Sequence, residues 1–355
     1  MSKYVELVAA VGLGLVMCGK AQAQDIHFSQ FYENAILRNP ALTGIFSGDY
    51  KAGVNYRNQW SNISVPFQTV LASVESRISV NEEVGDMLSF GVTSTYDKAG
   101  SISFNSFQIY PAINFNKALE DKQQSYLSAG FTAGYVQRSV DPNKMTFGSQ
   151  YVGGNYSASN PSNEHITNVK MSYFDMGAGV SFNSSLGENH HINYYLGAAA
   201  YHLNKPKAAF NPDEGFIRLS TKWNGNLGVQ YLIDNQVGLT IHANYSQQGQ
   251  YREIISGALL SWRKIDPSMT NLFTIYGGLF FRVGDAFIPT VKLDYKKYSF
   301  TVSYDINTSG LRTATNKMGG MEISVYSRGI LTKGLWAQDK TKCPRFEELI
   351  MPGFE

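Results

Sequence analysis

The histidines are the side chains of this sequence best suited to acid–base chemistry, and there are six of them. His202 precedes Asn204 by two positions, and His242 precedes Asn244 in the same way. A His-centred site could serve a hydrolase if a serine nucleophile lay within reach. However, residues i and i+2 share one face of any strand, and no serine is distinguished by its neighbours. The pattern predicts ordinary strands, and we expect a protein that is not an enzyme.

A metal site is not expected either. His190 and His191 are adjacent and follow Glu188 closely. Adjacent residues of a strand point to opposite faces, and a zinc site needs at least three protein ligands. We therefore expect no metal and no cofactor.

The first 23 residues have the pattern of an export signal. An apolar run over residues 7–18 precedes Ala21-Gln22-Ala23, the small-x-small arrangement of a signal peptidase site. We predict cleavage between Ala23 and Gln24, which removes residues 1–23 as a signal peptide.

The sequence has two cysteines. Cys18 would begin a lipoprotein, but the bulky Met17 stands where the cleavage site needs a small residue. Cys343 then has no partner for an intramolecular disulfide. We interpret it as a buried or idle thiol, with an intermolecular disulfide as the alternative.

The composition argues against a soluble globule and against nucleic-acid binding. Charged residues make up 16% of the chain, compared with about 25% in soluble domains, while aromatic residues reach 13%. The net charge is only +2, and no basic face of the kind that binds nucleic acid is visible. No stretch after the leader reaches the roughly 18 apolar residues of a membrane-spanning helix. An exported chain of this kind can still lie in a membrane as a closed β-barrel.

Apolar and polar residues alternate with a period of two after Ser47. In one run, Phe174 and Met176 flank Asp175. This period is typical of strands with one apolar face, and it predicts about fourteen strands long enough to cross a bilayer at a tilt. The expected strands span residues 49–58, 67–77, 86–96, 101–115, 124–138, 170–183, 191–203, 217–232, 236–246, 251–263, 272–283, 286–296, 298–306 and 318–328.

We therefore predict an all-β fold, a single closed transmembrane antiparallel β-barrel over residues 49–328. Its longest connections, residues 140–167, 203–215 and 307–316, all follow odd-numbered strands, as expected if the long loops share one side of the membrane. A soluble β-sandwich is the alternative, because alternation alone does not distinguish lipid from a second sheet.

An even number of strands places both ends of the barrel on the periplasmic side. The prediction is a periplasmic N-terminal segment, residues 24–48, and a periplasmic C-terminal tail, residues 329–355. Tyrosines and phenylalanines near strand ends suit the aromatic girdles at the membrane interfaces. The expected girdle residues include Tyr56, Tyr110, Phe115, Tyr135, Phe182, Tyr231 and Tyr295.

The N-terminal segment carries aromatic residues without a sustained helical or strand period. Exposed aromatic side chains are unfavourable unless they pack against something. The segment is therefore interpreted as a plug that seals the barrel mouth, as a docking strip for periplasmic machinery, or as both. The candidate docking residues are Phe28, Phe31, Tyr32, Asn39 and Pro40.

Charged residues fall on the polar side of the alternation. An Arg or Lys that faces lipid near the bilayer midplane costs about 2 to 4 kcal/mol, so these side chains should face the lumen. They can pair across the interior and stiffen the barrel, or they can grip an inserted segment of a secreted protein. The predicted lumen charges are Lys51, Arg57, Asp175, Asp305 and Glu322.

A series of short motifs resembles one known family, the type IX secretion system membrane proteins called PorP/SprF. The resemblance begins with QDIHFSQFYENAILRNPALTG at residues 24–44 and YRNQW at residues 56–60. It continues in order with LSAGFTAGYVQ, YHLNKPKAAF, GDAFIP, SYDINTSGL, GGMEIS and KCPRF. Each motif alone is weak, but their order along the chain is specific. The last nine residues, EELIMPGFE, depart from the family pattern.

The resemblance implies a non-enzymatic barrel in the cell outer membrane that serves protein secretion, gliding motility or both. The implied partners are outer-membrane lipid, a secreted cargo protein or adhesin with a C-terminal signal domain, and periplasmic components of the secretion machinery. The barrel would bind its cargo and retain it at the cell surface. A substrate-specific, porin-like outer-membrane channel is the alternative.

Overall fold

The computed structural model describes residues 25–329 apart from residues 62–64, 82–83, 121–123, 164–167, 188–189, 211–216, 266–270 and 314. The predicted signal cleavage site, Cys343 and the C-terminal tail beyond Gly329 lie outside the described residues, as do His165 and Glu188. Within the described part, no helix has the length and apolarity that a membrane crossing requires.

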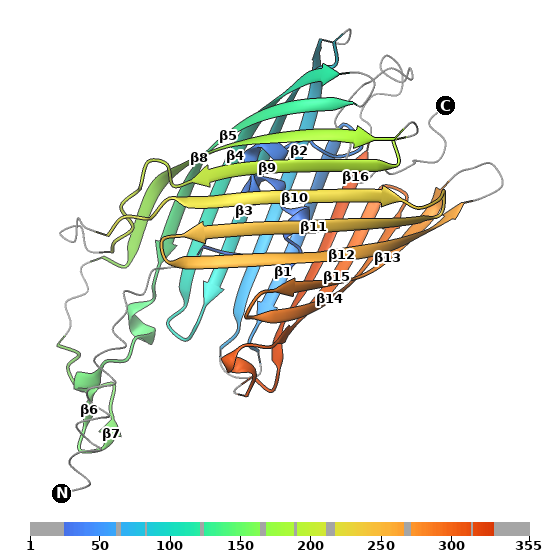
Figure 1. The fold of residues 1–355 in the computed structure, drawn as a ribbon. Coiled ribbons are helices and arrows are strands. Elements are labelled where there is room, and N and C mark those ends of the chain that lie inside the picture. The colour runs from blue at the N-terminus through green and yellow to red at the C-terminus, as the bar shows by residue number, and fades with distance from the viewer. Residues whose placement is uncertain are drawn as a thin grey trace, which may run out of the picture.

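Fourteen antiparallel strands form a closed barrel, as the sequence predicted. Each strand pairs with the next along the chain, and β1 pairs with β16 from Tyr50 opposite Gly329 to Gln59 opposite Gly320. Figure 1 shows the strands wrapping steeply around the lumen. The barrel strands are β1 (Tyr50–Gln59), β2 (Phe67–Asn81), β3 (Asp86–Ala99), β4 (Phe104–Glu120), β5 (Ser125–Ser139), β8 (Lys170–Leu186), β9 (Ile192–Tyr201), β10 (Lys222–Leu232), β11 (Val237–Gln248), β12 (Tyr251–Ile265), β13 (Asn271–Arg282), β14 (Ala286–Tyr295), β15 (Tyr298–Asn307) and β16 (Met318–Gly329).

The alternation of residue types becomes an alternation of exposure. On β8, the side chain of Phe174 is 73% exposed and that of Met176 is 51% exposed, whereas Asp175 between them is fully buried. Successive side chains of a strand point to opposite faces, so the apolar residues cover the outside of the barrel and the polar ones face its lumen. Closure leaves no open sheet edge, which is the condition for strands to lie in hydrocarbon.

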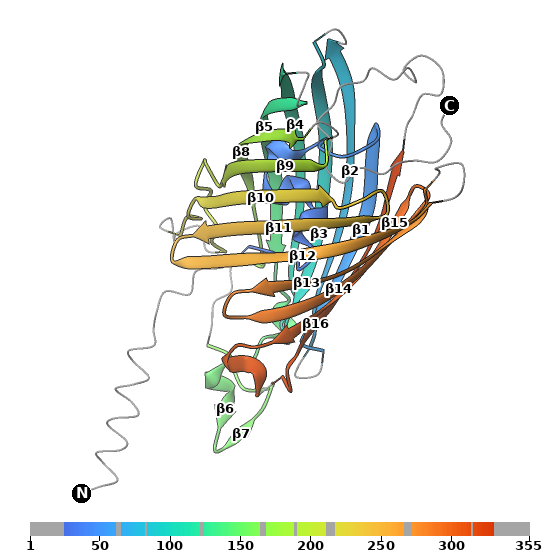
Figure 2. The same cartoon turned by 45° about the vertical axis from the view of Figure 1, so that its right-hand side comes forward.

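The two ends of the barrel differ. We call the end at which β1 ends the long-loop rim, because it carries the connections β5–β8, β9–β10 and β15–β16. The opposite end, at which β1 begins and β16 ends, is the short-turn rim. The β5–β8 connection, which the sequence identified only as one of the longest, contains the 3-10 helices η3 (Pro142–Lys144) and η4 (Gly148–Gln150) and a hairpin of β6 (Tyr151–Val152) and β7 (Asn155–Tyr156). Figures 1 and 2 show this hairpin beyond the rim.

The N-terminal segment lies inside the barrel (Figure 2). It forms η1 (Phe31–Glu33), the short helix α2 (Ala35–Arg38) and η2 (Pro40–Leu42). The Asn39 side chain accepts a hydrogen bond from the N–H of Ala41, and Pro40 occupies the first position of η2, where its missing N–H is not needed. Such short helices are marginal in isolation, so contacts with the barrel wall must hold them.

The lumen is not uniformly polar. Inward-facing Ile255, Phe280 and Ile288 on β12, β13 and β14 are buried, so these strands carry apolar residues on both faces over part of their length. Tyr110, which the sequence assigned to a membrane girdle, is also buried, and its hydroxyl donates to Asp175 Oδ2 at 2.9 Å. That assignment was wrong because closeness to a strand end does not decide which face a residue occupies.

Two substitutions on β8 should separate the lipid-facing midplane from the rim. Val180 lies near the middle of the strand and is 54% exposed, and Leu186 ends the strand at 42% exposed. Val180→Arg should destabilise the barrel by about 2 to 4 kcal/mol and Leu186→Arg by about 0 to 1 kcal/mol, because the cost of a lipid-facing charge depends on depth. Reversible denaturant unfolding in lipid vesicles measures both values. Equal losses at the two positions would contradict the predicted membrane depth.

Candidate functional site

Residues 25–49, here called the plug, run through the lumen from one rim to the other. Asp25 pairs with His202, which follows β9 at the long-loop rim. At the other end, the N–H of Asp49 donates to the carbonyl of Gly329 at 2.7 Å. The sequence placed the whole segment at or below the barrel mouth beside the start of β1. The structure instead extends it along the lumen, because wall side chains at every level bond to it.

The carboxylate of Glu322 binds the plug through its backbone. Its two oxygens accept hydrogen bonds from the N–H groups of Ser29 at 2.7 Å and Gln30 at 2.9 Å. The side-chain amide of Asn55 also donates to it, at 2.8 Å. Buried backbone N–H groups are costly without a partner, so this wall carboxylate lets a non-helical stretch of the plug lie in the interior.

A second carboxylate, Asp305, joins two arginines to the plug. Its Oδ2 lies 2.9 Å from Arg57 Nη2 and 3.2 Å from Arg282 Nη1. Its Oδ1 accepts a hydrogen bond from the hydroxyl of Ser29 at 2.5 Å. Arg57 also donates to the carbonyl of His27 at 2.5 Å. The charges that the sequence placed in the lumen therefore pair with each other and with the plug.

The plug contributes one buried carboxylate of its own, Glu33. It lies 3.0 Å from Lys51 Nζ and 2.9 Å from Lys292 Nζ, and all three side chains are nearly inaccessible to solvent. A buried charge is tolerated when it is paired and hydrogen-bonded. Glu33 therefore bridges β1 and β14 through the interior.

The central part of the plug packs tightly against β4, β5 and β8. Asn39 Nδ2 donates to the carbonyl of Val180 at 3.1 Å, and the carbonyl of Ala41 accepts from Asn114 Nδ2 and Ser181 Oγ, each at 3.0 Å. A Cβ on Gly130 would lie 2.3 Å from the Pro40 carbonyl carbon. Only glycine permits this approach of the plug backbone to the wall.

The aromatic residues of the plug fill the apolar side of the lumen. Tyr32 stacks against both His242 and Phe280, with ring centroids 4.9 and 5.2 Å from its own, and Phe31 meets Phe280 edge to face at 5.8 Å. The surrounding wall residues are Ile255, Leu259, Tyr276, Ala286 and Ile288. This cluster explains why β12, β13 and β14 carry apolar residues on both faces.

Charged groups fix the first residue of the plug at the long-loop rim. The Asp25 carboxylate lies 2.9 Å from His202 Nε2 and 3.4 Å from Lys222 Nζ, and Asp175 lies 2.9 Å from His202 Nδ1. Burial raises the pKa of Asp25, but Lys222 and His202 outweigh it and hold that pKa below its ordinary value. Burial lowers the pKa of His202, but the carboxylates of Asp25 and Asp175 outweigh it and raise the pKa to about 9.

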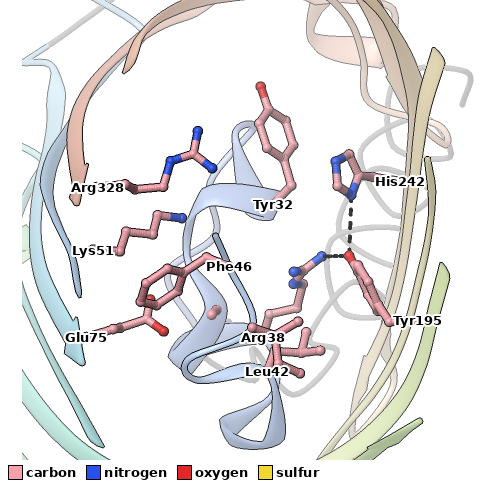
Figure 3. A pocket seen from close by; sticks show the side chains of 11 residues that line it. Tyr32, Arg38, Leu42, Phe46, Lys51, Glu75, Tyr195, His242 and Arg328 are labelled. Carbon is pink, nitrogen blue, oxygen red and sulfur yellow. Dashed lines mark hydrogen bonds between the residues drawn. The ribbon is translucent and has the colours of Figure 1, made fainter. Parts of the chain in front are cut away.

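A small cavity remains beside the plug, in the half of the lumen nearer the short-turn rim. Figure 3 shows Arg38 pointing across it to Tyr195, whose hydroxyl accepts from Arg38 Nη1 at 2.6 Å and lies 3.3 Å from His242 Nδ1. The cavity has a volume of about 40 Å³, which holds roughly three water molecules. It is too small for a nutrient-sized solute. The other lining residues are Tyr32, Ala35, Leu42, Ile45, Phe46, Lys51, Glu75 and Arg328.

The five candidate docking residues, Phe28, Phe31, Tyr32, Asn39 and Pro40, are all buried within the barrel. Their side chains can meet another protein only if the plug leaves the lumen. The five predicted lumen charges, Lys51, Arg57, Asp175, Asp305 and Glu322, are also buried, and each faces the plug or its immediate neighbours.

The sequence reasoning did not single out Glu33, Arg282 and Lys292. Arg282 and Lys292 occupy inward positions of β13 and β14, so the alternation rule applied to every strand would have found them. Glu33 is the acidic residue between the aromatic pair Phe31-Tyr32 and α2. Nothing in its local sequence shows that two lysines lie opposite.

Within the described residues the histidines do not form a metal centre. No group of three or more His, Cys, Asp or Glu side chains there is arranged to hold a metal ion. His190 Nδ1 lies 2.6 Å from Ser185 Oγ in the β8–β9 turn. His202 and His242 contact the plug. The geometry therefore assigns the two lumen histidines to holding the plug.

Replacement of Glu33 should destabilise the protein strongly. Glu33→Gln leaves Lys51 and Lys292 as buried cations without their shared carboxylate, and breaking a buried ion pair costs about 3 to 5 kcal/mol. The matched control is Lys117→Ala at the short-turn rim, whose half-exposed ion pair with Asp86 contributes about 0 to 1 kcal/mol. Denaturant unfolding of both variants measures the difference. Similar small losses would show that the plug contributes little to stability.

The N-terminal end of the plug should loosen in alkaline buffer. Because the pKa of His202 is about 9 in the folded protein against an ordinary value of 6.5, its ion pairs contribute fully below pH 6.5 and are lost as pH rises through about 9. The free energy of unfolding of the unmodified protein should fall over that range more than that of His202→Gln, which cannot titrate. Parallel pH profiles for the two proteins would contradict this assignment.

A family model described as type IX secretion system membrane protein PorP/SprF matches residues 20–326, and a search of curated proteins found no match. Among solved structures, the monoaromatic hydrocarbon channel TodX, as a deltaS2S3 mutant, is 10% identical with a TM-score of 0.49, covering 83% of this chain and 92% of that one. A Pseudomonas aeruginosa FadL homologue is 9% identical with a TM-score of 0.48, covering 81% and 92%.

CdiB from Acinetobacter baumannii is 8% identical with a TM-score of 0.40, covering 79% of this chain and 60% of CdiB, so this chain spans less than two thirds of CdiB. The family model, in contrast, takes in the whole plug and nearly the whole barrel. The chain belongs to the type IX secretion system membrane protein PorP/SprF family.

Proposed function

We propose that this outer-membrane barrel of the type IX secretion machinery binds a cognate secreted protein and retains it at the cell surface, in protein secretion, gliding motility or both. The observation that carries the proposal is the plug. It crosses the whole lumen and is held there by the buried carboxylates of Glu33, Asp305 and Glu322. A barrel that is filled in this way acts as a binding platform more readily than as a conduit.

The long-loop rim offers a surface for the secreted protein. The β6–β7 hairpin presents Tyr151, Val152 and Tyr156 at 60%, 63% and 46% exposed. Exposed aromatic and apolar residues at a loop tip are typical of interaction surfaces. If long loops face the outside, as in bacterial outer-membrane barrels, the hairpin meets the secreted protein at the cell surface. Periplasmic partners would then meet the short-turn rim, where β1 begins and β16 ends.

The retention role can be tested at the hairpin. Cells that carry Tyr151→Ser, Val152→Ser and Tyr156→Ser together should release the cognate secreted protein into the medium, because loss of hot-spot side chains weakens binding by about tenfold or more. The control replaces exposed polar residues of the same connection, Asn143→Ala with Ser159→Ala, and should keep the protein on the cells. Surface labelling and blotting of the medium measure both fractions. Unchanged retention in the triple variant would refute this docking surface.

Measurements of ion flow distinguish our proposal from the porin-like alternative, which predicts an open channel. In planar bilayers, the intact protein should show no steady single-channel conductance, because the plug fills the lumen. A variant lacking residues 25–46 should conduct, because a closed barrel of more than about eight strands leaves space that side chains alone do not fill. Steady conductance by the intact protein at the level of the deletion variant would favour the substrate-specific channel.

A further inference from the structure

A second cavity lies outside the lumen, at the long-loop rim. It occupies the angle between the β9–β10 loop and the β11–β12 turn, which Figures 1 and 2 show side by side. Its volume is about 430 Å³, which is within the range of small-molecule sites. It is lined by Lys205, Arg218, Leu219, Ser220, Thr221, Trp223, Gln247 and Gly249.

The loop above this cavity has a defined conformation at its base. Lys207 pairs with Arg218 in an isolated antiparallel bridge, and the N–H of Leu219 donates to the carbonyl of Pro206 at 3.1 Å. The Arg218 guanidinium donates to the carbonyl of Lys205 at 3.2 Å. These bonds bring Lys205 and Arg218 together on the same side of the loop.

The floor of the cavity is the outer surface of the barrel. Trp223 on β10 is opposite Gln247 on β11, and Gln247 is opposite Arg252 on β12. Trp223 is 59% exposed, while its neighbour Asn224 is buried in the lumen. Since side chains alternate between the two faces of a strand, Trp223, Gln247 and Arg252 form one outward-facing row just below the rim.

Three cations of this region have no counter-ion among the residues that the structure describes. Lys205, Arg218 and Arg252 are exposed, and within the part of the chain that the structure describes none has a carboxylate within 4 Å. Elsewhere along the same rim the lysine nearest the plug, Lys222, is paired with Asp25. Two cations without a counter-ion among the described residues therefore line the cavity, and a third, Arg252, lies beside Gln247 in the neighbouring strand.

The position of this row restricts the ligand. A lipid-facing arginine is tolerated near the membrane interface but not near the midplane, and tryptophan is enriched at the same level. Arginine and lysine bind phosphate through charge-assisted hydrogen bonds, while Ser220, Thr221 and Gln247 can bond to hydroxyl groups. A ligand that meets all these groups carries phosphate on a polyhydroxylated body and is delivered at the membrane surface.

We propose that this cavity binds the phosphorylated saccharide headgroup of a lipid in the surrounding leaflet. Lys205, Arg218 and Arg252 bind the phosphate, and Trp223 packs against the sugar ring and the start of the acyl chains. Occupation of the site fixes a lipid against the β9–β10 loop, beside the residue to which Asp25 of the plug is paired. The site is independent of the proposed binding of a secreted protein.

The test measures binding of bisphosphorylated lipid A to the purified full-length protein in detergent, by native mass spectrometry and by titration with a fluorescent lipid A. Lys205→Ala with Arg218→Ala should weaken binding by about tenfold or more, because hydrogen bonds to charged groups are among the strongest in proteins. Trp223→Leu should weaken binding to a smaller extent. The matched control is Lys296→Ala with Lys297→Ala, in the β14–β15 turn at the short-turn rim, and should bind as the unmodified protein does.

Two competitors identify the source of the phosphate. Dephosphorylated lipid A should compete poorly, and inorganic phosphate alone should not compete at equal concentration. The proposal is overturned if the double variant binds lipid A as tightly as the control variant, or if inorganic phosphate displaces the lipid as well as unlabelled lipid A does. Unchanged heat-modifiable mobility in gel electrophoresis shows that each variant retains a folded barrel.

Discussion

The pairing of buried charges across the lumen is the constraint on which the rest of the structure depends. A barrel of fourteen strands is wider than the eight-stranded barrels that side chains alone can fill. Charges that cannot face lipid must point inward, where each needs a partner. Glu322 and Asp305 find theirs in the plug backbone, in Ser29 and in two wall arginines. The plug in turn provides one carboxylate, Glu33, which forms ion pairs with two lysines of the barrel wall. Neither part satisfies its polar groups without the other.

This mutual dependence also gives the plug its position. A single ion pair would hold a segment of this length loosely, but contacts occur at every level between Asp25 at one rim and Asp49 at the other. The aromatic cluster around Tyr32 adds apolar burial on one side, and Gly130 in β5 allows close backbone contact on another. Networks of this kind specify one arrangement more than they add stability. For a membrane component of a secretion machine, the consequence is a rigid, filled barrel whose rims are left for other proteins and for lipid.

The two rims are chemically different surfaces. The long-loop rim carries an exposed aromatic hairpin and, on its outer side, an open cavity lined by Lys205 and Arg218, which have no counter-ion among the described residues. The first suits a protein partner and the second suits phosphorylated lipid. Because the plug begins at this same rim, beside His202 and Lys222, the loop that contributes the cations is joined directly to the anchored end of the plug. At the short-turn rim, the chain passes directly from the plug into β1.

The sequence by itself determined the barrel. The evidence was the alternation over some fourteen segments, the low content of charge, and the position of Asp175, Asp305 and Glu322 on the polar side of that alternation. This was enough because a strand has only two faces and lipid excludes charge from one of them. The order of the family motifs also indicated a membrane protein of the type IX secretion system. Only the tertiary structure decided what the lumen contains. Glu33 meets Lys51 and Lys292, and Tyr110 turns inward to Asp175, through contacts between residues far apart in the chain. Local pattern fixes the face on which a side chain lies, whereas the partner on that face depends on how the strands close and where the plug then fits.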